Sequence, residues 1–189
     1  MLKPLALALL VVASLAAPAA AGPARPRSDQ RASLVELLAA YELRLDRATL
    51  DSIGPEVPQM LIDIAGKPRE RATVRVRALA ALAFYPTVFT QAFLRAQLWE
   101  RGWIGTPLGV QMRAQAMRSL GRAFGENAVD DIAALKDDPD PLVRAAVATA
   151  LVDAGSPNAV PLLESWLPNE SVFTVRDAVD RALQKLRGK

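Results

Sequence analysis

The feature that most constrains this chain is an internal repeat in its C-terminal third. The stretch 125–135 returns as 155–167, so that Gly125 and Gly155 open two copies of one pattern. Each copy leads through a polar turn into a second apolar segment, first at 143–147 and then at 175–179. A period of this size marks stacked supersecondary units, none of which can bury its apolar face alone. The repeat therefore predicts a solenoid in which each unit covers the next.

Proline marks where the helices of this solenoid are expected to begin. A proline at the first helical position is tolerated because its missing N–H would have no partner there. Four prolines follow a residue that suits the N-cap, at Gly54-Pro55, Thr106-Pro107, Asp140-Pro141 and Ser156-Pro157. The apolar periodicity then predicts four helical hairpins, 55–64 with 71–84, 87–100 with 107–124, 127–136 with 141–154, and 157–167 with 172–186. No segment alternates apolar and polar residues as a strand does, so the predicted class is all-α.

One more helix is predicted before the repeats, over about 29–47. Apolar residues recur along one face of it, at Leu34, Leu37, Leu38, Tyr41, Leu45 and Ala48. This segment has no match in the repeat, and a solenoid needs an atypical terminal element to cover its first apolar face. We therefore interpret it as an N-terminal capping helix.

The third predicted hairpin carries a family resemblance. The run DPDPLVRAAVATAL at 138–151 resembles the HEAT repeat, including its phycobilisome-lyase-like subgroup, in its acidic-proline turn, its Val-Arg opening and its spaced small residues. The resemblance spans 54–186 and implies a right-handed, armadillo-like α-solenoid of about four HEAT-like hairpins. Only the third hairpin has the whole motif. The first offers two Val-Arg pairs, Val74-Arg75 and Val76-Arg77.

The same resemblance implies a structural ladder of arginines. In the family, the arginine after the valine bonds to acidic turn residues of a neighbouring repeat. The matching residues here are Arg113, Arg144 and Arg176, with Asp138 or Asp140 as the clearest acceptor. These residues are therefore expected to hold the fold together.

Composition argues against an enzyme. The chain has no cysteine and no histidine, so disulfides, thiol catalysis and the commonest general base are excluded, and any catalysis would rest on carboxylates, lysine or hydroxyls. The aspartates at 137–140 could suggest a calcium loop, but prolines interrupt them and no glycine-containing 12-residue loop is present. Helix capping and the ladder explain them better. We expect no metal, no cofactor and no catalytic residue.

The N-terminal residues have the composition of a secretory signal. A lysine precedes an apolar run at 5–15, and three alanines before Gly22 fit the small-x-small cleavage rule. An uncleaved membrane anchor is the alternative, but the run is shorter than the roughly 18 residues that a spanning helix needs. We expect a signal peptide at 1–21, a mobile tail at 22–30 and a single domain at 31–189. The mature protein would then be periplasmic or secreted, with no stable membrane span.

The three tryptophans lead to different predictions. Trp166 and Trp99 each fall in phase with apolar residues of their own helix, so both are predicted to lie in the core. Trp103 lies in 101–106, a connection longer than its counterparts, and an insertion in one repeat often sits at the binding surface. The alternative for Trp103 is that it folds back and fills the wider gap between helices.

Charge is unevenly distributed along the chain. Residues 66–125 contain ten basic and two acidic residues, whereas 126–170 contain nine acidic and two basic ones. Either the molecule is an electrostatic dipole, or these charges neutralise one another across neighbouring repeats. Few aromatic residues are interleaved with the arginines, so we expect no nucleic acid partner.

The inner face, formed by the second helices, is the expected binding groove. On the second hairpin the residues predicted to face the groove or its rim are Arg113, Met117, Arg118, Gly121 and Arg122, with Trp103 as the next candidate. The matching positions of the third hairpin are small or apolar. A basic patch beside an apolar strip suits an acidic protein or peptide with an apolar anchor, because the charges steer the encounter and the anchor contributes most of the affinity. The alternative is that these arginines are simply solvated.

Three functional hypotheses follow. The first is an exported, non-enzymatic HEAT-like scaffold that binds a protein or peptide partner on its inner face. The second is an enzyme accessory or lyase-like solenoid that cradles a small molecule. The third is a structural protein whose open C-terminal end pairs with another copy, so the oligomeric state is left open.

Overall fold

The computed structural model describes residues 27–41 and 45–188. The predicted signal peptide at 1–21, and residues 22–26 of the predicted tail, lie outside this part of the chain. In chain order the helices are α1 (Arg27–Ala39), α2 (Arg47–Asp51), α3 (Val57–Gly66), α4 (Ala72–Leu82), α5 (Val88–Trp99), α6 (Pro107–Phe124), α7 (Val129–Ala133), α8 (Pro141–Ala154), α9 (Ala159–Trp166) and α10 (Phe173–Arg187). Three short 3-10 helices join them, η1 (Arg101–Trp103), η2 (Gly125–Ala128) and η3 (Leu167–Asn169). Within the described ranges there is no strand, which confirms the predicted all-α class.

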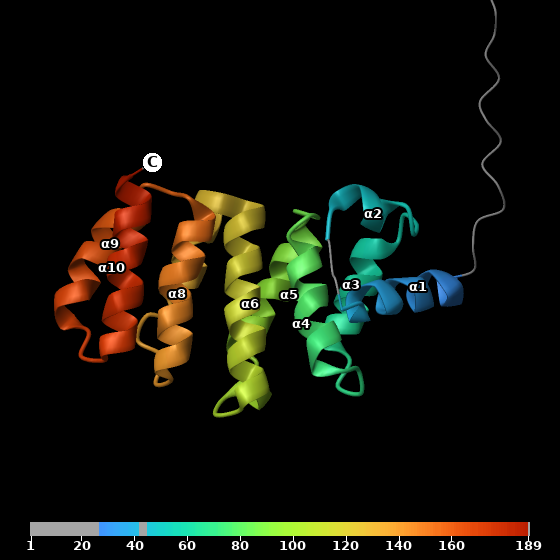
Figure 1. Cartoon of the computed structure of the whole chain (residues 1–189), viewed down its shortest axis with the longest axis horizontal. Helices are drawn as coiled ribbons and strands as arrows, with labels where there is room; N and C mark the ends of the chain where they lie inside the picture. The colour runs from blue at the N-terminus through green and yellow to red at the C-terminus, as the bar shows by residue number, and fades with distance from the viewer. Residues whose placement is uncertain (1–26, 42–44, 189) are drawn as a thin grey trace, which may run out of the picture.

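The helices form hairpins that stack along one axis (Figure 1). The pairs are α3 with α4, α5 with α6, α7 with α8, and α9 with α10, and the second helices pack in succession, α4 on α6, α6 on α8 and α8 on α10. This confirms the predicted HEAT-like solenoid. The connection inside every hairpin lies on the same side of the stack, the lower side in Figure 1. We call this side the turn edge; it consists of 67–71, 100–106, 134–140 and 167–172. None of the described helices is both long enough and apolar enough to cross a membrane.

Small residues let neighbouring second helices approach closely. At Gly121 of α6, an added Cβ would lie 2.6 Å from the carbonyl oxygen of Ala150 and 2.9 Å from the amide nitrogen of Ala154, both on α8. The prediction that Gly121 faces the groove is therefore wrong: it is buried where α6 crosses α8. The apolar layer around this crossing includes Val147 and Leu151, which are also buried. Absence of a side chain at 121 is what permits this close packing.

The N-terminal cap differs from the single helix predicted over 29–47. The first helix begins earlier, so that Arg27 to Gln30 are helical rather than part of a tail, and it ends at Ala39. Its end is fixed by Arg77 of α4, whose Nη1 donates to the carbonyl oxygens of Leu38 and Ala40, both at 2.8 Å. These bonds also distinguish the two Val-Arg pairs of the first hairpin, because Arg77 binds the N-terminal cap.

A second short helix completes the cap. Asp46 accepts a hydrogen bond from the amide of Thr49 at 2.8 Å and starts α2. Tyr85, at the end of the first hairpin, donates its hydroxyl to Asp51 at 2.8 Å, and the guanidinium of Arg47 lies 4.3 Å from the Tyr85 ring. Tyr41, predicted to lie on the buried face, is 97% exposed because the first helix has already ended at Ala39.

The proline signals locate helix starts to within two residues. Thr106 and Asp140 cap α6 and α8 as predicted, accepting from the amides of Gly109 and Leu142. Two of the starts fall later than predicted, at Val57 for α3 and at Ala159 for α9. Before α9, Ser156 accepts from the amide of Asn158 and forms a turn instead of a cap, so this proline precedes the helix rather than opening it.

Candidate functional site

The turn edge is built on arginines near the start of the second helices. Arg75 and Arg113 are buried, and the side chain of Arg144 is 14% exposed. Each donates to a backbone carbonyl of its own hairpin: Nε of Arg75 to Ala65 at 2.9 Å, Nε of Arg113 to Leu98 at 3.0 Å, and Nη1 of Arg144 to Asp138 at 2.8 Å. These bonds satisfy carbonyls in the last turn of the first helix, or in the connection after it, and tie the two helices of a hairpin together.

Each of these arginines also reaches one residue of the following hairpin. The guanidinium of Arg75 lies 4.9 Å from the centre of the Trp103 ring, Arg113 pairs with Asp138, and Arg144 pairs with Glu170. At the turn edge, one arginine therefore links each hairpin to the next. Trp103 occupies in the first link the place that a carboxylate occupies in the next two.

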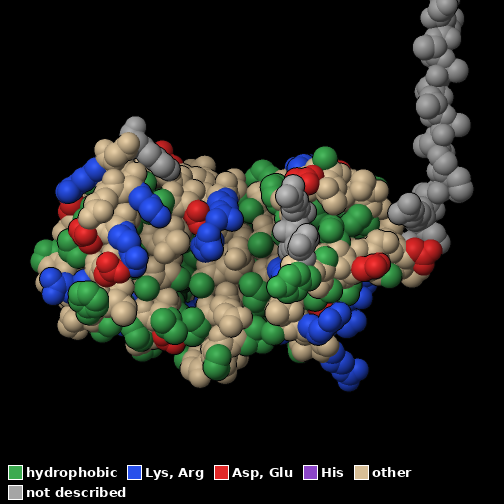
Figure 2. Space-filling model, in the orientation of Figure 1, with side chains coloured by type: hydrophobic (Ala, Val, Ile, Leu, Met, Phe, Trp, Pro, Cys, Tyr) green, Lys and Arg blue, Asp and Glu red, His purple; other side chains and the backbone are tan. Residues whose placement is uncertain are grey.

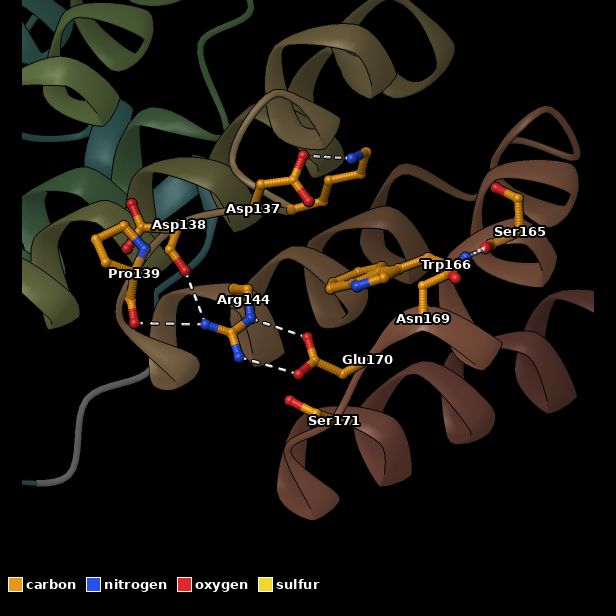
Figure 3. A pocket seen from close by; sticks show the side chains of 10 residues that line it. Asp137, Asp138, Pro139, Arg144, Ser165, Trp166, Asn169, Glu170 and Ser171 are labelled. Carbon is orange, nitrogen blue, oxygen red and sulfur yellow. Dashed lines mark hydrogen bonds and ion pairs between the residues drawn. The ribbon is translucent and has the colours of Figure 1, made fainter.

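The Arg144–Glu170 pair lies in a hollow of about 610 Å³ between the third and fourth hairpins (Figure 3). Nε and Nη2 of Arg144 donate to the two carboxylate oxygens of Glu170, at 2.9 and 3.0 Å. These bonds, with a further one from the amide of Val172, lower the pKa of Glu170 to about 2. Arg144 already makes four hydrogen bonds, so its guanidinium has little capacity left to bind a ligand in this hollow. We therefore interpret the Arg144–Glu170 pair as a structural contact between the third and fourth hairpins.

The acceptors in this ladder agree only in part with the expectation, since Asp138 is the acceptor for Arg113 but Glu170 is the acceptor for Arg144. Asp138 gives its carboxylate to Arg113 and only its backbone carbonyl to Arg144, while Asp140 accepts from the amide of Leu142 and caps α8. Arg176 is exposed and makes no ion pair or hydrogen bond with any described residue. It lacks a partner because each link is completed by the next hairpin, and no described hairpin follows α10.

Sequence reasoning missed Glu170, although a signal was present. Asp138 stands six residues before Arg144, and Glu170 stands six residues before Arg176. In both copies the acidic residue therefore precedes the Val-Arg pair by the same distance. The turn at 167–172 lacks prolines next to its acid, and this loss of the Asp-Pro pattern hid the equivalence.

A second candidate site is a hollow of about 300 Å³ on the inner face, formed by α6, α8 and α10. Its lining combines cations with small and apolar side chains: Arg118, Thr149, Val152, Asp153, Ala178, Arg181, Ala182 and Lys185. Figure 2 looks onto the second helices and shows basic side chains over α6 and over the α8–α10 end of this face. We call this hollow the inner hollow. It brings residues of three hairpins to one place.

Only part of the predicted binding patch faces this inner hollow. Arg118 lines it, and Arg122 lies beside it: their Nε atoms pair with the two carboxylate oxygens of Asp153, at 2.9 and 3.3 Å. Met117 is fully buried and Arg113 belongs to the turn edge, so the prediction that both face the groove is wrong. The reason is that α6 is covered on two sides, by α4 and by α8, which leaves a narrow exposed stripe.

The burial of the tryptophans agrees only in part with the prediction. Trp166 is buried as predicted, but Trp99 is 58% exposed. The buried side of α5 carries Leu94 and Leu98 together with two polar residues, so the more apolar stripe through Trp99 is the outer one. Trp103 is half-buried beneath Arg75, and its backbone fills the space that a Cβ of Gly109 would need. Trp103 therefore fills the gap between hairpins.

Much of the charge asymmetry is cancelled in the fold. Four arginines from the basic stretch 66–125 pair with carboxylates from the acidic stretch 126–170: Arg95 with Asp131, Arg113 with Asp138, and Arg118 and Arg122 with Asp153. Neutralisation across neighbouring hairpins therefore accounts for part of the pattern. The cations that remain unpaired define which surfaces can attract an anionic partner.

Comparison with known proteins identifies the repeat. The family model of HEAT repeats matches residues 110–184, which run from α6 to α10 and include the Arg113 and Arg144 links. No curated protein matches the sequence. HEAT repeats generally form non-enzymatic helical scaffolds that mediate protein interactions. Residues 110–184 therefore contain HEAT repeats, and the hairpins stacked before them continue the same solenoid.

Proposed function

We propose that this protein is an exported, non-enzymatic HEAT-repeat scaffold that binds an acidic protein or peptide segment in the inner hollow. The family supports the scaffold role, since HEAT repeats suggest a protein-interaction module. The observation that supports the site is the combination of an excess of cations with a small apolar floor. The partner's acidic residues would meet the cations, and one apolar side chain would enter the floor.

The charges of the inner hollow favour an anionic segment. Arg118 is partly neutralised by Asp153, and Arg181 pairs with Asp177 on the surface of α10. Lys185 makes no ion pair or hydrogen bond with the residues described, so it offers a free ammonium group at the rim. Since a surface pair such as Arg181–Asp177 contributes little to stability, a partner's carboxylate can compete for Arg181 at low energetic cost.

The floor limits what can enter. Thr149, Val152, Ala178 and Ala182 come from adjacent turns of α8 and α10 and leave a shallow space of about 300 Å³. A space of this size lies at the lower end of ligand pockets and suits one side chain rather than a whole small molecule. The inner hollow therefore favours a peptide anchor over a cradled cofactor.

Reversing the two α10 cations is expected to weaken partner binding. Arg181→Glu with Lys185→Glu should lower the affinity at least about tenfold at low salt, because electrostatic complementarity governs encounter and specificity. The matched control is Lys67→Glu with Arg69→Glu, which makes the same change in net charge on exposed, unpaired residues of the turn edge. Immobilised protein would be exposed to a detergent-solubilised cell envelope at low salt, and eluted proteins would be identified as salt rises.

A second variant tests the floor without changing charge. Thr149→Trp should fill the inner hollow and remove the same partner, while the melting temperature changes little because Thr149 is exposed. If the partner is retained by both the α10 and the Thr149 variants, or is lost equally by the Lys67 and Arg69 control, the inner hollow is not the binding site.

Export predicts a defined N-terminus. The apolar run at 5–15 and the three alanines before Gly22 are the basis for this expectation. Protein recovered from the periplasm or the medium should have an intact mass that begins at Gly22. Recovery of a full-length cytoplasmic product that begins at Met1 would contradict both the export and the cleavage.

A further inference from the structure

Four cations of the basic stretch are left unpaired by the fold, and all lie at the turn edge. Of the ten basic residues in 66–125, four pair with carboxylates of a following hairpin and two, Arg75 and Arg77, donate to backbone carbonyls. The remaining four are Lys67, Arg69, Arg71 and Arg101. All are exposed, and none of their side chains makes an ion pair or hydrogen bond with a described residue.

These cations come from two neighbouring turns that border one hollow. Gly66, at the end of α3, and Pro68 of the first turn line one side of it, and Glu100, Gly102 and Trp103 line it from the second turn. Glu70, in the first turn, is neutralised by Arg31 at 2.9 Å. Glu100 is therefore the one carboxylate of these two turns without a cationic partner, and the four cations remain in excess. Figure 2 shows basic side chains projecting from the lower edge of the molecule, below α4.

Two large apolar side chains accompany the cations. Trp99, at the end of α5, is 58% exposed, and Ile104, in the second turn, is 63% exposed. They bracket Arg101 in the chain. Exposed residues of this size beside unpaired cations have no role in the packing of the solenoid, since the link at this position is made by Trp103.

We propose that these six residues, Lys67, Arg69, Arg71, Trp99, Arg101 and Ile104, form a membrane-facing surface that binds anionic lipid headgroups. Clustered lysine and arginine attract an anionic leaflet, and tryptophan is favoured at the boundary between headgroups and acyl chains. Ile104 borders a hollow of about 390 Å³, whereas the four cations and Trp99 line none of the hollows described, which suits contact with a flat surface. The protein would lie on the membrane through this edge without crossing it.

A lipid surface explains this group of residues better than other anionic partners do. A bound acidic peptide would need to enter the hollow between the two turns, and Glu100, which lines that hollow without a cationic partner, would repel it. Single-stranded nucleic acid is bound by aromatic platforms set along a basic groove, and these two turns offer one exposed tryptophan beside the cations. The inner hollow lies on α6, α8 and α10 instead. The protein could therefore bind a partner and a membrane at the same time, and each of the two proposals can be disproved without the other.

Binding to vesicles tests the proposal. The full chain would be sedimented with vesicles of phosphatidylcholine alone and with vesicles that contain phosphatidylglycerol. Because the apolar run at 5–15 can itself bind lipid, the quantity measured is the gain in affinity on adding the anionic lipid. Arg69→Glu with Arg101→Glu should reduce that gain at least about 25-fold, since each cation near an anionic surface contributes roughly a factor of five. The gain should also fall steeply as salt rises.

The matched control is Arg176→Glu with Arg187→Glu, two exposed cations of α10 at the far end of the solenoid with the same change in net charge. This control pair should leave the gain in affinity for anionic vesicles unchanged. Tryptophan emission should move to shorter wavelength on the anionic vesicles and be quenched by spin-labelled lipid, and Trp99→Phe should remove most of that response. The proposal would be overturned if both double variants lost the gain in affinity equally, or if Arg69→Glu with Arg101→Glu did not reduce it. So would binding to soluble polyglutamate or single-stranded DNA that matches the binding to anionic vesicles.

Discussion

Replacing Arg144 with alanine is expected to lower the free energy of unfolding by about 3 kcal/mol. The substitution removes four hydrogen bonds and leaves Glu170, whose side chain is 5% exposed, as a buried carboxylate without its cation. Hydrogen bonds to charged groups contribute roughly 1.5 to 3 kcal/mol, and breaking a buried pair by removing one partner costs about 3 to 5 kcal/mol. Urea unfolding followed by circular dichroism measures the change.

The matched control is Arg176→Ala. Arg176 holds the same position in the repeat but makes no bond to a described residue, so its loss should change stability by no more than about 0.5 kcal/mol. A double-mutant cycle with Glu170→Gln should show strong coupling, because both residues belong to one joint. Strictly additive effects of Arg144→Ala and Glu170→Gln would show that the pair does not act as a unit.

The same pair predicts a dependence of stability on pH. The pKa of Glu170 falls from its ordinary value of 4.5 to about 2 in the folded protein, chiefly through the bonds from Arg144. A carboxyl group with a lowered folded pKa stabilises the fold above its unfolded pKa, and this stabilisation is lost as pH falls from about 4.5 to about 2. The loss is on the order of 3 kcal/mol and should be absent in Glu170→Gln. An unchanged acid transition in Glu170→Gln would contradict this assignment.

The second large effect is expected at the crossing of α6 and α8. Gly121→Ala should destabilise the protein by about 2 kcal/mol, although alanine is the better helix former, by about 1 kcal/mol. The new Cβ would lie 2.6 Å from the carbonyl oxygen of Ala150, and a backbone atom cannot move aside as a flexible side chain can. Forcing an extra carbon into a packed interface costs about 1 to 3 kcal/mol.

Gly66→Ala provides the control for this substitution. Gly66 also lies in a helix, but its nearest neighbour to an added Cβ is the Phe93 ring at 3.8 Å, an ordinary contact. The change should therefore be neutral or stabilising, by up to about 1 kcal/mol. Equal melting temperatures for Gly121→Ala and the unmodified protein would show that α6 and α8 do not pack as closely as described here.

The local elements of this protein could be predicted from its sequence. The four hairpins, the caps at Thr106 and Asp140, and the repeat of Val-Arg pairs all rest on neighbouring residues, so one stretch of sequence is enough to specify each. The family match over 110–184 agrees with that interpretation. The break between α1 and α2 escaped prediction because Arg77, from a helix further along the chain, ends the first helix at Ala39.

What the sequence could not decide was which neighbour each face and each charge would meet. Trp99 and Met117 were placed on the wrong side because periodicity detects an apolar stripe but not the helix that covers it. Arg118 and Arg122 were predicted to face the groove or its rim, and their partner Asp153, more than 30 residues away, could not be identified from the sequence. Such contacts depend on how the hairpins stack, and only after stacking is it clear which cations remain unpaired. The repeat therefore determined the architecture, whereas the candidate binding surfaces are set by long-range packing.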